Sequence, residues 1–303
     1  MRLGYIGLGN MGGALAARLA PGGDVYAFDM NAEAVAAQVS LGAAAAPDLR
    51  SVAKECDVIF LCLPTSAHVR QVIFGPDGLS GDLRPGTVII DQTSGDPRET
   101  RQINDELASL GVDLVDAPVS GGPVRAAEGT IAIMVGCADE QYARVQTLLH
   151  RISPNVCRAG ELGSGHAVKL VNNLVSGIIR WATLEGVALA AKLGVCPQSA
   201  VEIMSAGGAR NDWMAAVTAD PQRESCERVQ HRLGPQGLEG RLRTGRCGIR
   251  PAPAREPDSR DLSDVRQRVG IRHQGRRDGA HDGSHGRYAR RPGRLHLRLS
   301  IAK

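Results

Sequence analysis

The stretch that decides the fold is the N-terminal Met1-Arg2-Leu3-Gly4-Tyr5-Ile6-Gly7-Leu8-Gly9-Asn10-Met11-Gly12. A short apolar strand runs into the pattern Gly7-x-Gly9-x-x-Gly12, and an apolar helical pattern follows it through Leu19. In a dinucleotide-binding turn, one glycine permits the tight turn, one lets the backbone approach a pyrophosphate, and one lets the helix pack on the strand. Amide groups at the helix N-terminus then face the phosphates. Because glycine-rich turns are common, this pattern needs support from its surroundings.

That support comes from a second expected strand, residues 24–29, which ends in Asp29. A carboxylate about 20 residues after the glycines accepts hydrogen bonds from the adenosine ribose. It also repels a 2′-phosphate, so Asp29 favours NAD over NADP. The alternative is a turn aspartate before Asn31, but the glycine pattern and the acid together predict a dinucleotide site.

Further apolar strands are expected at 57–64, 87–91 and 112–116, with helical stretches between them. Continuous apolar strands are typical of a parallel sheet buried on both faces, so we predict an α/β fold with a doubly wound Rossmann sheet. Ligands of such sheets lie beyond the carboxyl ends of the strands. This places Leu63, Pro64 and Thr93 at the rim of a nicotinamide pocket, although a strand stop and a loop hydroxyl would explain Pro64 and Thr93 equally simply.

A glycine turn follows the last of these strands, in Asp116-Ala117-Pro118-Val119-Ser120-Gly121-Gly122-Pro123. The Ser120 hydroxyl and two unobstructed glycine amides form a concavity that suits a carboxylate. A flexible turn without a ligand is the alternative, and these residues alone leave both interpretations open.

A long helix is expected from Gly163 and Gly165, where an apolar-periodic stretch begins that runs to about Gly194. Lys169 and Asn173 lie one turn apart on one face near its start. Burial lowers the pKa of an ammonium, so a lysine on the inner face of this helix can accept a proton near neutral pH. An ordinary surface pair is the alternative for these two residues taken alone.

Over about residues 1–215, three stretches in this order resemble the signatures of the 3-hydroxyisobutyrate dehydrogenase (β-hydroxyacid dehydrogenase) family. They are Gly7-Leu8-Gly9-Asn10-Met11-Gly12, Asp116-Ala117-Pro118-Val119-Ser120-Gly121-Gly122, and Gly163-x-Gly165-x-x-x-Lys169-x-x-Asn172-Asn173. The resemblance implies an NAD-binding Rossmann domain over residues 1–162. It also implies an all-helical C-terminal domain, joined through the long helix that begins near 163.

The resemblance further implies roles for matching residues. Lys169 is the expected catalytic general acid/base, and Asn173 is expected to orient substrate and lysine. Ser120, Gly121 and Gly122 are expected to bind the substrate carboxylate, and no metal site is expected. The expected cofactor contacts are Gly7, Leu8, Gly9, Asn10, Met11, Gly12, Asp29, Leu63, Pro64 and Thr93.

The implied activity is that of an oxidoreductase. It transfers a hydride between NAD, in preference to NADP, and a small β-hydroxyacid or the corresponding semialdehyde. Hydroxyisobutyrate, tartronate semialdehyde, glyoxylate and succinic semialdehyde all fit a small carboxylate pocket, and Arg125 and residues 205–210 are expected to tune the choice. Imine or ketoacid reductases share the fold, but they tend to replace the lysine. A non-catalytic or inactivated dinucleotide-binding protein is the alternative from another class.

Composition is consistent with a cytoplasmic enzyme. The seven cysteines contain no Cys-x-x-Cys pair, which is typical of reduced thiols. The first apolar run is a glycine-broken strand rather than a signal peptide. No stretch approaches the ~18 uninterrupted apolar residues of a membrane span, so no membrane partner is expected.

The chain changes in composition near Pro221. Of the 36 basic and 32 acidic residues, 20 and 9 fall in 221–303, so residues 1–220 carry a net charge of −7. Beyond Pro221 no amphipathic pattern lasts two turns, and we expect a disordered tail. Arginine-rich segments bind nucleic acid, but Tyr288 is the only aromatic residue there and Lys303 the only lysine. A nucleic-acid partner is therefore not expected.

GC-rich DNA read in the wrong frame yields such an arginine-rich segment with almost no lysine. Re-read one base forward, codons for residues 229–239 permit Phe-Asn-Ile-Ala-Leu-Ala-Leu-Lys-Asp-Leu-Lys, and the resemblance implies a Phe-x-x-x-Leu-x-x-Lys-Asp-Leu helix there. We hypothesise a frame shift, in the gene or in its sequencing, between about Trp213 and Val229. Residues 163–220 are then the start of an incomplete helical domain, and 221–303 are out of frame.

An incomplete domain has three expected consequences. Apolar positions of the long helix should be exposed, namely Ile178, Ile179, Leu184 and Leu189. Turnover by this chain should be weak or absent. The resemblance implies a homo-oligomer, which the break puts in doubt.

Overall fold

The structure is a computed structural model that describes residues 1–214, all within one compact unit, Met1–Gln230. The predicted tail at 221–303 and most of the interval proposed for the frame shift lie outside the described residues.

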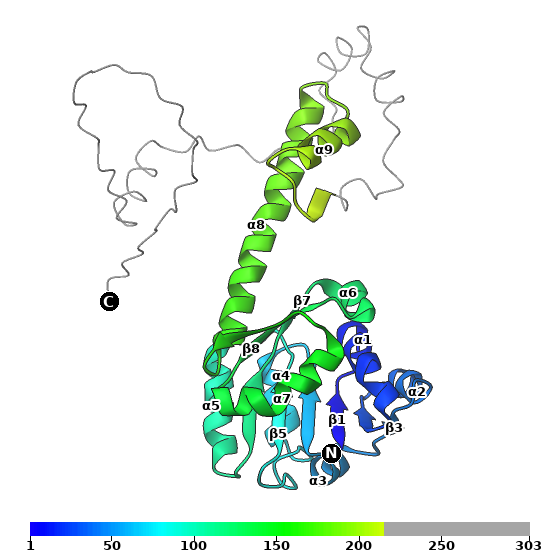
Figure 1. Ribbon diagram of the computed structural model, residues 1–303, viewed down its shortest axis with the longest axis vertical. Helices are drawn as coiled ribbons and strands as arrows, with labels where there is room; N and C mark the ends of the chain where they lie inside the picture. Colours follow the sequence, from blue (N-terminus) through cyan, green and yellow to red (C-terminus); the bar gives the residue numbers. More distant parts are fainter. Residues whose placement is uncertain (215–303) are drawn as a thin grey trace, which may run out of the picture. The chain divides into compact units, whose positions relative to one another are not determined.

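Within the described part of the chain, a nine-stranded sheet forms the centre of the fold (Figure 1). Its parallel portion has the strand order β3-β2-β1-β4-β5-β6, as in a Rossmann sheet. These strands are β1 (Leu3–Ile6), β2 (Val25–Phe28), β3 (Ala44–Ala45), β4 (Val58–Leu61), β5 (Val88–Asp91) and β6 (Asp113–Asp116). The α/β class is therefore confirmed, and every predicted strand is present.

Three further strands extend the sheet beyond β6. β8 (Ala132–Gly136) pairs antiparallel with β6 and with β7 (Val119–Ser120), and parallel with β9 (Val156–Gly160). The strand β7 carries the predicted glycine turn at its end, so this extension places the turn next to the carboxyl end of β6.

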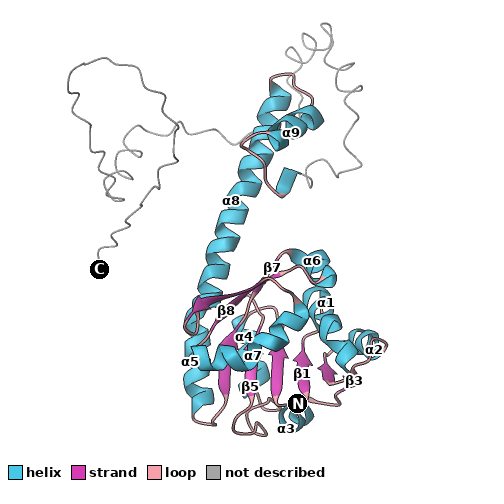
Figure 2. Cartoon of the chain, viewed as in Figure 1, coloured by secondary structure: helices cyan, strands magenta, loops and turns pink. Residues whose placement is uncertain are grey.

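Helices cover both faces of the sheet (Figure 2). They are α1 (Asn10–Leu19), α2 (Ala32–Val39), α3 (Leu49–Glu55), α4 (Ser66–Phe74), α5 (Pro97–Ala108), α6 (Gly122–Glu128) and α7 (Asp139–Ile152), with a 3-10 turn at Ala20–Gly22. Alternate residues of a strand point to opposite faces. Phe60 thus packs with residues of α1 and α7, and Ile59 with residues of α3, α4 and α5. Burial on both faces explains the continuous apolar runs.

The predicted long helix is α8 (Ser164–Lys192), which is followed by α9 (Pro197–Ala206). Its N-terminal turns contact the sheet, and its C-terminal half packs against α9. Ile178, Ile179 and Leu189 are exposed, as predicted. The prediction for Leu184 is wrong, because this side chain is half-buried against a small cluster of Val187, Val201 and Met214.

By length and composition, the 29-residue α8 could also cross a bilayer. The expectation from the sequence missed this helix, because it counted only uninterrupted apolar residues. A single helix of this kind is weak evidence for a membrane, since core helices of globular proteins have the same composition.

Candidate active site

A cavity of about 810 Å³ lies beyond the carboxyl ends of β1, β2 and β4. The predicted cofactor residues that line it are Gly7, Gly9, Asn10, Met11, Gly12, Asp29, Leu63 and Pro64. Leu8 lines an adjoining polar pocket of about 460 Å³. The structure adds His68, Gln71 and Val72 from α4, which no sequence motif marks. The cavity therefore joins residues of the glycine turn to the strand end at Leu63.

The three glycines of the turn meet different surroundings. Gly7 has φ +91°, and a Cβ there would lie 2.3 Å from the Cys62 carbonyl oxygen. A Cβ on Gly12 would lie 1.9 Å from the Gly7 carbonyl oxygen, whereas a Cβ on Gly9 would meet nothing within 4 Å. Gly7 and Gly12 thus permit close packing, and Gly9 leaves open space beside the start of α1. This is the division of roles that a bound pyrophosphate requires.

Asp29 is held in place by two backbone amides. Its Oδ2 accepts from the Leu8 amide at 2.6 Å, and its Oδ1 accepts from the Asn31 amide at 2.8 Å. The carboxylate lines both pockets, and Glu33 of α2 lines the polar one. Among the described residues, neither pocket is lined by a lysine or an arginine.

Lys169 is half-buried in the second turn of α8, and this burial lowers the pKa of its ammonium. Within residues 1–214, no hydrogen bond or ion pair holds that ammonium. Three residues further along the helix, Asn172 Nδ2 donates to Ser120 Oγ at 3.0 Å. Asn173 is exposed. The helix therefore meets the glycine turn through Asn172, whose place in the sequence motif carried no assigned role.

The glycine turn is a strand-to-helix junction. Ser120 ends β7, and Gly121 and Gly122 lead into α6 with φ +140° and +78°. Residues other than glycine rarely adopt such φ angles. Arg125 of α6 packs beside Gly121 and lies 3.4 Å from Asp212 in an exposed ion pair. The turn thus combines one hydroxyl with two backbone positions that only glycine fills without strain.

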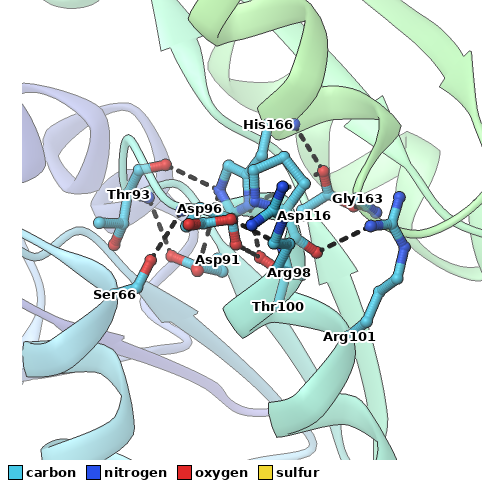
Figure 3. Close-up of polar contacts among 11 residues, drawn as sticks. Ser66, Asp91, Thr93, Asp96, Arg98, Thr100, Arg101, Asp116, Gly163 and His166 are labelled. Atoms are coloured by element: carbon cyan, nitrogen blue, oxygen red, sulfur yellow. Dashed lines mark hydrogen bonds and ion pairs between the residues drawn. The ribbon is translucent and has the colours of Figure 1, made fainter.

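A buried polar cluster around Asp116 and His166 lies at the start of α8 (Figure 3), and it was not expected from the sequence. Asp116 Oδ1 accepts from the Gly163 amide and Oδ2 from the His166 amide, each at 2.7 Å. These amides belong to the start of α8, which has no side-chain cap of its own. The carboxylate of β6 therefore caps the helix that carries Lys169, and it lies where the helix dipole favours an anion. Burial nevertheless raises the pKa of Asp116, since two amides offset only part of the desolvation.

Thr93 belongs to this cluster and does not line the cavity. The residue is 1% exposed, and its Oγ1 accepts from the Leu63 amide at 3.1 Å. Its carbonyl accepts from His166 Nε2 at 2.9 Å. The predicted direct contact of Thr93 with the cofactor stays a prediction, and the contacts seen hold the cavity wall instead.

The cysteine nearest the cofactor residues is Cys62, which lines the cavity. Burial raises the pKa of its thiol to about 12. The thiol is therefore protonated at neutral pH and contributes apolar lining rather than a nucleophile. Of the described cysteines, Cys56, Cys62, Cys137 and Cys157 are free.

Comparison with known proteins gives two family matches. Residues 2–160 match the NAD binding domain of 6-phosphogluconate dehydrogenase. Residues 163–226 match a model described as the NAD-binding region of NADP-dependent 3-hydroxyisobutyrate dehydrogenase.

Individual relatives agree with these matches. The chain is 39% identical over 217 residues to 2-(hydroxymethyl)glutarate dehydrogenase of Eubacterium barkeri, which covers 71% of this chain and 72% of the relative. It is 36% identical over 207 residues to 3-hydroxyisobutyrate dehydrogenase of Pseudomonas aeruginosa, covering 67% and 70%. A solved structure of 3-hydroxyisobutyrate dehydrogenase from Salmonella typhimurium superposes with TM-score 0.63 at 31% identity, covering 71% of this chain and 75% of that one.

Proposed function

The chain belongs to the 3-hydroxyisobutyrate dehydrogenase (β-hydroxyacid dehydrogenase) family of NAD(P)-dependent enzymes, and we propose that Lys169 is the general acid/base of its reaction. The observation that carries this proposal is the half-buried Lys169, whose pKa is lowered by burial and which precedes Asn172, the residue that binds Ser120, by three positions on α8. The substrate we propose is a small β-hydroxyacid or its semialdehyde.

The chain's residues divide the chemistry as follows. The amides of Gly121 and Gly122 and the Ser120 hydroxyl hold the substrate carboxylate. Neutral Lys169 takes the proton of the substrate hydroxyl during oxidation and returns it to the carbonyl oxygen during reduction. Such assistance contributes roughly two to four orders of magnitude in rate. The bound nicotinamide supplies the hydride chemistry.

The residues present fit a dinucleotide. Open space beside Gly9 leaves room for a pyrophosphate, and the cavity continues from there to Leu63 and Pro64. Asp29 and Glu33 both line the polar pocket that adjoins this cavity, and their carboxylates would repel an adenosine 2′-phosphate bound there. We propose NAD as the preferred cofactor for this reason.

Titration of NADH and NADPH fluorescence on the chain as it stands tests this preference. NADH should bind more tightly. Glu33→Gln removes one negative charge, whose repulsion of the 2′-phosphate is about 1 kcal/mol in water. NADPH binding should therefore improve by about three- to tenfold. NADH binding should stay the same, because the 2′-hydroxyl carries no charge. Equal affinity of the parent chain for both cofactors would refute the preference.

We also propose domain limits of 1–162 and from 163 onward, with the frame shift hypothesised above. The match of the second family model ends at residue 226, inside the proposed interval. Resequencing the gene tests the hypothesis, and an uninterrupted frame would refute it. A chain with the frame restored should turn over, whereas the present chain should bind NADH with weak or no turnover.

We further propose a cytoplasmic location and a small carboxylate as the partner, with neither nucleic acid nor a membrane. A homo-oligomer is proposed only for the frame-restored chain. Analytical ultracentrifugation of the present chain and of the frame-restored chain gives the oligomeric state of each.

A further inference from the structure

We infer that His166 is a positioning residue that fixes the start of α8, and with it Lys169, to the β5–α5 loop beside the cofactor cavity. This role presupposes Lys169 as the proton acceptor proposed above. His166 does not reach the cavity itself and acts only through the residues that it holds.

The imidazole of His166 joins three elements. It is fully buried, and its Nε2 lies 2.9 Å from the Thr93 carbonyl oxygen. A carbonyl can only accept, so Nε2 carries a hydrogen and donates it. Its Nδ1 lies 2.8 Å from Thr100 Oγ1 in the first turn of α5. One side chain of α8 therefore binds both the loop after β5 and the helix that follows that loop.

Thr93 connects the imidazole to the cavity wall. While its carbonyl accepts from His166, its hydroxyl oxygen accepts from the Leu63 amide, and its own amide donates to Asp91 Oδ1 at 2.9 Å. All three polar groups of Thr93 are thus engaged in a buried site. Loss of the imidazole would leave a buried carbonyl without its partner, which costs roughly 1–3 kcal/mol and favours rearrangement of the loop.

Close packing leaves the helix start little freedom. A Cβ on Gly95 of the loop would lie 2.8 Å from His166 Cε1, and a Cβ on Gly165 would lie 2.4 Å from the Met134 carbonyl oxygen. Gly95 and Gly165 therefore let the loop and β8 approach the start of the helix closely. A shift of the His166 side chain moves the helix against these contacts.

Lys169 follows His166 by three residues, nearly one helical turn, so both lie on the same side of α8. The pKa of Lys169 is lowered by burial, so it reports how closely this turn packs. Asp91 Oδ2 and Asp116 Oδ2 lie 3.9 Å from Nε2 and Nδ1 and are the charged groups that face the imidazole. Neither carboxylate touches Lys169, so the helix backbone carries the effect of His166.

The test uses the small number of lysines in the full chain, which are Lys54, Lys169, Lys192 and Lys303. Acetylation over a pH series, read by mass spectrometry, gives the titration midpoint of each amine without requiring turnover. In the folded parent chain, Lys169 should titrate below the same lysine in the urea-unfolded chain. His166→Leu should raise the Lys169 midpoint and so remove most of that difference. His166→Gln, whose amide can still donate to the Thr93 carbonyl, should keep the lower midpoint.

Two further variants keep the test decisive. Val187→Ala removes buried side-chain volume from the same helix far from the cluster, so it should lower stability but leave the Lys169 midpoint in place. Thr100→Val is isosteric and removes the Nδ1 partner, together with the bond of the Thr100 hydroxyl to the Asp96 carbonyl at the start of α5. If His166→Leu does not fold, Thr100→Val should still give a smaller shift in the same direction.

The outcomes separate the two proposals. A folded parent chain in which Lys169 titrates as it does in the unfolded chain contradicts the proposed proton acceptor. A lowered midpoint in the parent chain that neither His166→Leu nor Thr100→Val changes overturns the positioning role. The same shift in Val187→Ala would also overturn the positioning role, because a general loss of stability would then explain the change in the Lys169 midpoint.

Discussion

Asn172 Nδ2 donates to Ser120 Oγ at 3.0 Å, which ties the helix α8 to the glycine turn after β7. Both side chains are half-buried, and Asn172 follows His166 by six residues along α8. The two ends of the proposed site, the proton acceptor and the carboxylate turn, are therefore held together by one hydrogen bond between side chains.

Asn172→Ala should raise KM for the substrate by about two- to tenfold, the effect of one lost hydrogen bond that orients Ser120. Asn173→Ala, at the exposed neighbouring position, is the matched variant. If Asn173 orients the lysine and substrate as the family resemblance implies, its loss should lower kcat instead. Steady-state kinetics of the frame-restored chain distinguish the two, and an unchanged KM in Asn172→Ala would contradict the role of the contact.

Gly9→Ala and Gly12→Ala should fail in different ways. A Cβ on Gly9 meets open space, so the variant should fold normally but lose NADH affinity at least tenfold, since the methyl group occupies the space for the pyrophosphate. A Cβ on Gly12 would lie 1.9 Å from a carbonyl oxygen, so this variant should be strongly destabilised. Urea unfolding and NADH titration give both results. Normal NADH binding by Gly9→Ala would show that the phosphates lie elsewhere.

Asp116→Asn should destabilise the start of α8 by about 1–3 kcal/mol. The amide oxygen of asparagine can accept from only one of the Gly163 and His166 amides, and the new NH2 group faces the other amide, which is also a donor. Hydrogen exchange at Gly163 and His166 should accelerate, whereas exchange in the C-terminal half of α8 should not. Uniform acceleration along the helix would instead indicate a general loss of stability.

Lys169→Met should stabilise the fold at neutral pH, because it removes a partly dehydrated ammonium that has no partner among the described residues. The sign follows from linkage. The folded pKa of Lys169 lies below the unfolded value of about 10.4, so the parent chain gains stability as pH rises through this interval. The advantage of the variant should therefore shrink between pH 7 and pH 10, as urea midpoints at both pH values would show. A variant less stable than its parent at pH 7 would mean that the ammonium has a favourable contact.

The sequence predicted those parts of the fold that local pattern determines. The apolar strands, the glycine turn at Gly7 and the helix through Lys169 all follow from periodicity and motif. The strand β7 did not, because its two residues are extended only through pairing with β8.

The site was predicted less completely for a similar reason. The motif contains both Asn172 and Asn173, and only the rotation of α8 against the sheet decides which one meets Ser120. The role of His166 depends on Thr93 and Thr100, which lie 73 and 66 residues away in the chain, so no local pattern carries it. Leu184 was misassigned because the packing of α9 against α8 is not encoded in the helix itself.

The most direct test of Lys169 as the general acid/base is the pH dependence of hydroxyacid oxidation by the frame-restored chain and its Lys169→Met variant. Activity is screened first against hydroxyisobutyrate and, in the reverse direction, against tartronate semialdehyde, glyoxylate and succinic semialdehyde. The parent kcat/KM for oxidation should fall as pH drops through the lowered pKa of Lys169. The variant should lose about 10²–10⁴-fold in kcat, lose this pH dependence and retain its NADH affinity. Undiminished turnover by Lys169→Met would contradict the account.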